Sequence, residues 1–100
     1  MDLKDIYLFK SKKINWNEEK NKLLKETRNI SFEEVLNLIE NKNILSIEEN
    51  PSSNFNNQKC FVLKLKDYIY LVPFVETENE VFLKTIIPSR KYKNIYLDKD

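Results

Sequence analysis

The chain has 100 residues, a formal net charge of +1, and neither histidine nor glycine. These absences exclude histidine as a general base or metal ligand, and they exclude glycine-rich phosphate loops and dinucleotide fingerprints. The length fits one domain, residues 1–100, with a modest core. No apolar run approaches the length of a membrane helix and no signal peptide is recognised, so we expect a cytoplasmic protein without a membrane partner.

Charge is distributed unevenly along the chain. Residues 10–28 carry seven positive and three negative side chains, residues 29–80 carry four and nine, and residues 81–97 carry four positive and no acidic side chains. If the two basic segments meet in space, they form a positive face that attracts a polyanion. An alternation of solvated faces explains the same pattern equally well.

The first elements are short. Residues 6–9 form an apolar run, which is a strand or an N-terminal arm, and residues 14–16 form a second extended piece. Asn17 is a natural N-cap, followed by two glutamates where the helix dipole favours acids. We expect a helix from there to Asn29, which can take a left-handed C-cap conformation in place of glycine.

A capping box opens the second helix. Ser31 and Glu34 have the required spacing, and Ile30 and Val35 occupy the positions of a hydrophobic staple. Apolar residues recur at helical spacing, which predicts a helix to about Glu40.

Strands dominate the rest of the chain. We expect them over residues 44–47, 60–66, 68–75 and 81–87. A polar loop over residues 48–58 separates the first two, Lys66-Asp67 can form a two-residue hairpin turn, and Pro73 indicates an edge strand or a bulge. Ser89 can cap a short helix through Tyr96. The order predicts an α+β fold with two N-terminal helices packed on an antiparallel sheet and a short C-terminal helix.

The last strand leads into a basic, aromatic segment. Alternation along the strand predicts that Phe82, Lys84 and Ile86 share one side. Arg90 follows, and with Arg28 it is one of only two arginines among 17 basic residues. A guanidinium can grip a phosphate with two parallel hydrogen bonds, whereas a solvated surface charge is the simpler explanation. We expect both arginines and Lys84 on one exposed face.

Three segments together resemble a known family. Residues 14–21 (Ile-Asn-Trp-Asn-Glu-Glu-Lys-Asn), 29–35 (Asn-Ile-Ser-Phe-Glu-Glu-Val) and 86–91 (Ile-Ile-Pro-Ser-Arg-Lys) occur in one order. They resemble the BrnT toxins, small ribonucleases of bacterial type II toxin–antitoxin modules with a RelE-like fold. The resemblance covers about residues 14–96 and leaves residues 1–13 as an N-terminal extension. Where the family usually has His-Gly, this chain has Arg28-Asn29.

The resemblance implies metal-independent RNA cleavage, in which the 2′-hydroxyl attacks the adjacent phosphate, with no cofactor. It implies two sets of site residues: catalytic Arg90, Lys91, Lys84 and Arg28, and RNA-binding Lys93, Tyr92 and Lys20. Proton transfer would fall to Lys91, Tyr92 or Glu19, and the sequence does not select among them. The implied partners are an RNA substrate and an antitoxin, of ribbon-helix-helix type, encoded nearby.

Other functions and roles remain open at this point. The chain can be a non-catalytic protein-binding or RNA-binding module of the same fold, or a structural protein without a polyanion partner. The aromatic residues Tyr92, Tyr96 and Trp16 can serve packing alone. The glutamates at positions 18, 19, 33 and 34 fit first-turn helix acids better than a metal site. Cys60 precedes an apolar run and is expected in the core rather than as a nucleophile.

Overall fold

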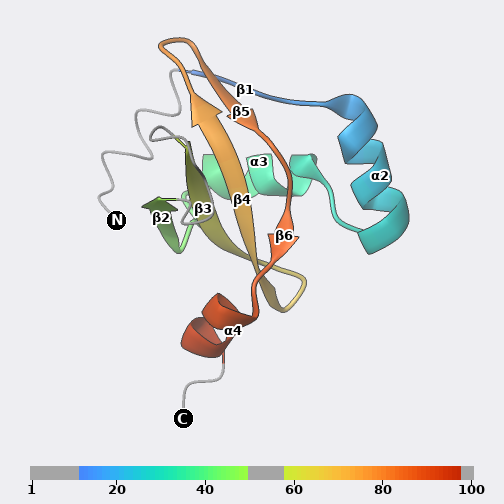
Figure 1. Cartoon of the computed structure of the whole chain (residues 1–100), viewed down its shortest axis with the longest axis vertical. Coiled ribbons are helices and arrows are strands. Elements are labelled where there is room, and N and C mark those ends of the chain that lie inside the picture. The colour runs from blue at the N-terminus through green and yellow to red at the C-terminus, as the bar shows by residue number, and fades with distance from the viewer. Residues whose placement is uncertain (1–11, 50–57, 98–100) are drawn as a thin grey trace.

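The computed structural model describes residues 12–49 and 58–97 of the chain (Figure 1). The expected strand or arm over residues 6–9 and most of the polar loop lie outside these ranges. The elements are β1 (Lys13–Trp16), α2 (Glu18–Arg28), α3 (Phe32–Glu40), β2 (Ser46–Glu49), β3 (Gln58–Leu65), β4 (Tyr68–Glu76), β5 (Glu80–Leu83), β6 (Ile87–Pro88) and α4 (Arg90–Tyr96). The fold is therefore α+β, with three helices in the described part and a mixed sheet.

The expectation of a purely antiparallel sheet is wrong at one edge. The strand order is β1-β5-β4-β3-β2, with β6 paired to β4. The pairs from β2 to β5 are antiparallel, but β1 runs parallel to β5, with Lys13 opposite Glu80 and Trp16 opposite Leu83. In the sequence, two helices lie between β1 and the other strands, so no hairpin turn sets the direction of β1.

The helix caps are those that the sequence predicts. The Asn17 side chain accepts a 2.9 Å hydrogen bond from the Lys20 N–H, and Asn29 is left-handed with φ 56°. The Ser31 hydroxyl accepts a hydrogen bond from the Glu34 N–H at 3.3 Å. The same hydroxyl donates to the Glu34 carboxylate, which therefore bonds to the serine side chain rather than to its backbone N–H. These caps fix the ends of α2 and the start of α3.

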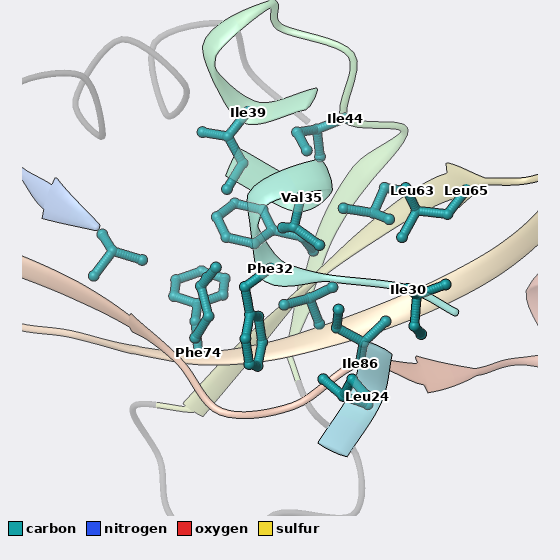
Figure 2. Close-up of a cluster of buried hydrophobic side chains, with 14 residues drawn as sticks. Leu24, Ile30, Phe32, Val35, Ile39, Ile44, Leu63, Leu65, Phe74 and Ile86 are labelled. Carbon is teal, nitrogen blue, oxygen red and sulfur yellow. The ribbon is translucent and has the colours of Figure 1, made fainter. Parts of the chain in front are cut away.

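The hydrophobic core lies between α3 and one face of the sheet (Figure 2). Phe32, Val35 and Ile39 project from α3, and all three are fully buried. Phe61 and Phe74 meet them from β3 and β4, with stacked rings 4.2 Å apart. Half-buried Trp16 also stacks on Phe32, so it packs against the core as expected.

The β3–β4 hairpin confirms its predicted turn. Lys66 and Asp67 both have positive φ, 48° and 65°, which matches the right-handed strand twist in a two-residue turn. Pro73, in contrast, lies in a central strand rather than at an edge. The β4–β5 pairing ends at the Phe74–Leu83 pair, and the pairing of β4 with β6 begins at Leu71 and Ile87. The gap in strand pairing along this side of β4 therefore includes Pro73.

Two predicted strands have different bounds. The first begins at Ser46 rather than residue 44, and Ile44 is buried in the core instead. The expected strand over residues 81–87 divides into β5 and β6, and residues 84–86 between them carry no strand pairing. The division breaks the predicted alternation: Ile86 is buried in the same core as Leu83, not on the side of Phe82.

The second face of the sheet is covered in part by α4. In the β3–β4 register Cys60 pairs with Pro73 and Phe61 with Val72, so Cys60 faces away from α3. Cys60 and Ile69 are nevertheless fully buried, and the Ser89 N–H donates to the Ile69 carbonyl at 3.0 Å, tying the start of α4 to β4. Cys60 is thus an interior residue, as expected.

Within the described ranges, no helix is long and apolar enough to cross a membrane.

Candidate functional site

An open hollow of about 640 Å³ lies between α2 and β5. We call it the α2–β5 hollow. It is lined by Asn17, Glu19, Lys20, Leu23, Phe82 and Lys84. Glu19, Lys20 and Leu23 lie in α2 and Asn17 caps that helix, whereas Phe82 lies in β5 and Lys84 directly follows it. The two basic segments of the sequence therefore meet here.

A buried asparagine holds α2 in position beside α3. Asn21 is 1% exposed, and its side-chain oxygen accepts a 2.8 Å hydrogen bond from the Phe32 N–H at the first turn of α3. Its amide group donates to Glu33 at 2.8 Å, and this bond is the main cause that lowers the pKa of the Glu33 carboxyl. Asn21 was not predicted as a structural residue; an asparagine inside a helix, where its propensity is poor, was the available signal.

One stripe of α2 faces the segment between β5 and β6. Lys20, Leu24 and Arg28 lie four residues apart on the same helix face and span about 12 Å along the axis. Leu24 is buried next to Ile86 (Figure 2). The Arg28 Nη1 donates to the Ile86 carbonyl at 2.9 Å, although 58 residues separate the two. Arg28 is nevertheless exposed.

Lys84 stands opposite Lys20 across the hollow. It is exposed, and its ammonium lies 5.7 Å from the centroid of the Phe82 ring. Lys84 is thus exposed, as expected, and it lies at an opening of the surface. Lys20, Arg28 and Lys84, which we call the basic strip, thus follow the seam between α2 and the β5–β6 segment.

Arg90 and Lys91 lie farther along the chain, in the first turn of α4. Both are exposed, and Arg90 follows Ile86 by only four residues, so it stands just beyond the end of the basic strip in sequence. No acidic residue occupies this turn. Two cations at a helix N-terminus oppose the helix dipole, which favours anions there. Helix stability therefore does not explain them.

The remaining candidates on α4 are less accessible. Tyr92 is half-buried and stacks on Tyr96 at 6.3 Å, and burial, with a contribution from the Glu48 carboxylate, raises its pKa. Burial likewise raises the pKa of the Cys60 thiol. Lys93 is half-buried as well. A phenol with a raised pKa is a poor general base, so Tyr92 fits the packing role that the sequence left open.

No family model, curated protein or solved structure matches this chain. Among the described residues no group of three or more carboxylates and thiols could hold a metal ion. The glutamates at positions 18, 19, 33 and 34 instead lie in the first turns of α2 and α3, as expected.

The candidates fall into two groups. Lys20 and Lys84 share the hollow and Arg28 continues the strip, whereas Arg90, Lys91, Tyr92 and Lys93 belong to α4 and do not line the hollow. Of the three residues considered for proton transfer, only Glu19 lines the hollow beside the two lysines. The arrangement offers cations for a phosphate, a carboxylate within the same hollow, and an aromatic ring. Leu23 and Phe82 were not predicted as site residues, because side-chain alternation alone does not reveal which half-buried residues flank an opening.

Proposed function

We propose that this protein is the toxin of a bacterial type II toxin–antitoxin module, an endoribonuclease that cleaves RNA without a metal ion, in a RelE-like arrangement of helices and sheet. The observation that carries the proposal is the convergence of basic residues from the two ends of the chain, with Lys20 and Lys84 in one hollow and Arg28 bound to Ile86. The resemblance to the BrnT toxins supports the same function.

The proposed reaction is an attack of the RNA 2′-hydroxyl oxygen on the adjacent phosphorus. A P–O bond forms to O2′, the bond from phosphorus to O5′ breaks, and the products are a 2′,3′-cyclic phosphate and a 5′-hydroxyl. Glu19 accepts the 2′-hydroxyl proton, and a lysine ammonium donates a proton to the departing O5′. The other cations of the basic strip stabilise the charge on the non-bridging oxygens. Arg90 acts as a further phosphate contact from α4.

Variants of Lys20 and Lys84, the two lysines that line the hollow, test this assignment. Lys20→Ala and Lys84→Ala should each lower the rate of RNA cleavage about a hundredfold, because each removes a charge contact made in the transition state. Lys22→Ala is the matched control, since Lys22 is an exposed lysine of the same helix that does not line the hollow. Equal loss in all three variants would show a non-specific charge effect and would contradict the site.

The non-catalytic alternative makes a different prediction. If the wild-type protein binds RNA in a salt-dependent manner but never cleaves it, the chain is a binding module and the enzyme assignment fails. For the toxin assignment, expression of the wild-type protein should arrest bacterial growth, and co-expression of the neighbouring small open reading frame should relieve the arrest. A harmless protein that binds no neighbouring gene product would contradict the toxin–antitoxin assignment.

A further inference from the structure

We propose that Phe82 is the platform on which one base of a single-stranded RNA stacks, with the basic strip holding the phosphates on either side. The proposal rests on the proposed function and deepens it, because it assigns base recognition to a residue that the cleavage chemistry does not use.

Phe82 is oriented away from the main core. It pairs with Val75 in the β4–β5 register, whereas its neighbours Val81 and Leu83 are fully buried on the α3 side. Its ring is half-buried and lines the α2–β5 hollow together with Leu23, which is 50% exposed. Aromatic rings on the open face of a sheet are a recurrent way to stack unpaired bases. The hollow thus has an apolar floor that the fold itself does not cover.

The charges beside this ring fit a nucleotide better than a base or a phosphate alone. The Lys84 ammonium lies 5.7 Å from the ring centroid, and Lys20 lines the opposite side of the same hollow. A stacked base would therefore have cations next to its sugar–phosphate links. Stacking between neighbouring bases in a duplex leaves no base face open to a side chain, so the occupant is single-stranded.

An acidic peptide is the competing occupant for a basic and apolar site. Peptide grooves generally present several apolar pockets at helix or strand spacing. Here the floor consists of one ring and one leucine, flanked by two lysines, so it offers one apolar position rather than a series of pockets. The lining therefore favours the nucleotide.

The test measures binding separately from cleavage. The probe is a fluorescently labelled single-stranded oligonucleotide with 2′-O-methyl groups throughout, which lacks the attacking hydroxyl, and a matched probe carries abasic sugars at its central positions. Each is titrated by anisotropy against the full chain. The variants are Phe82→Leu, Phe82→Tyr as the ring-retaining variant, and Tyr68→Leu as a control for loss of a half-buried aromatic side chain elsewhere on the sheet.

We expect Phe82→Leu to bind the base-containing probe about tenfold more weakly than wild type, the effect of losing one stacked base. Phe82→Tyr and Tyr68→Leu should keep wild-type affinity, and none of the three should change binding of the abasic probe. Lys84→Gln should weaken both probes and lower the slope of log affinity against log salt by about one.

The outcomes separate this inference from the proposed function. If Phe82→Leu binds like wild type while the wild-type protein cleaves RNA, the platform is overturned and the function stands. Equal wild-type affinity for the two probes overturns the platform without any variant, so a folding defect in Phe82→Leu cannot hide the result. If the wild-type protein neither binds nor cleaves RNA, and binds an acidic peptide instead, both proposals fail.

Discussion

Substitution of Arg90 separates function from stability. Arg90 is exposed, and it occupies the first turn of a helix, where its positive charge opposes the dipole. Arg90→Ala should therefore change the free energy of unfolding by no more than about 0.5 kcal/mol, with any change towards greater stability. If the guanidinium contacts a phosphate in the transition state, its loss should raise the barrier by about 3 kcal/mol, or lower the rate a hundredfold or more.

The assay compares RNA cleavage rates and thermal midpoints for wild type, Arg90→Ala and Arg90→Lys. Arg90→Lys retains the charge but loses the two-pronged grip, so it should remain substantially impaired. Unchanged cleavage in Arg90→Ala would refute the role of Arg90. A fall in thermal midpoint that accompanies the loss of activity would show that the residue is structural.

Three further predictions concern the interior and its titrating groups. Asn21→Ala should lower the free energy of unfolding by about 2 kcal/mol in urea titrations, because the buried Phe32 N–H loses its partner. The control, Asn37→Ala on the exposed face of α3, should cost less than about 0.5 kcal/mol. Equal losses would refute the role of Asn21 in joining α2 to α3. Cys60, buried and with a raised pKa, should resist alkylation at neutral pH until urea unfolds the chain, and rapid labelling of the folded protein would contradict its position. Because the pKa of Glu33 is lowered in the fold, the charged carboxylate stabilises the protein above the unfolded-state pKa, and this contribution is lost as the pH falls through the folded-state pKa. Glu33→Gln should therefore weaken the pH dependence of the free energy of unfolding below about pH 4.5. An unchanged pH dependence in that range would refute the contribution of Glu33.

Local signals predicted most of the elements correctly. Asn17, Asn29 and Ser31 cap the helices as expected, and the Lys66-Asp67 turn forms, because these features depend on residues within a few positions of one another. The same holds for Ser89 at the start of α4. The general α+β class followed from the order of those elements.

Long-range features could not be read from the sequence. The parallel pairing of β1 with β5 joins residues 13–16 to residues 80–83, and no local pattern encodes it. The break after Leu83 reverses the side to which Ile86 points, which simple alternation could not foresee. The charge pattern showed that two segments were basic, but only the fold shows that Lys20 and Lys84 share a hollow that the basic residues of α4 do not line.

The chemistry of the cleaved ends tests the central claim most directly. End-labelled RNA is incubated with the purified wild-type protein in excess EDTA, and the termini of the fragments are identified by mass spectrometry. The account predicts fragments ending in a 2′,3′-cyclic phosphate and beginning with a 5′-hydroxyl, and no cleavage at a nucleotide whose 2′-hydroxyl is methylated. Intact RNA, or fragments ending in a 3′-hydroxyl, would contradict it.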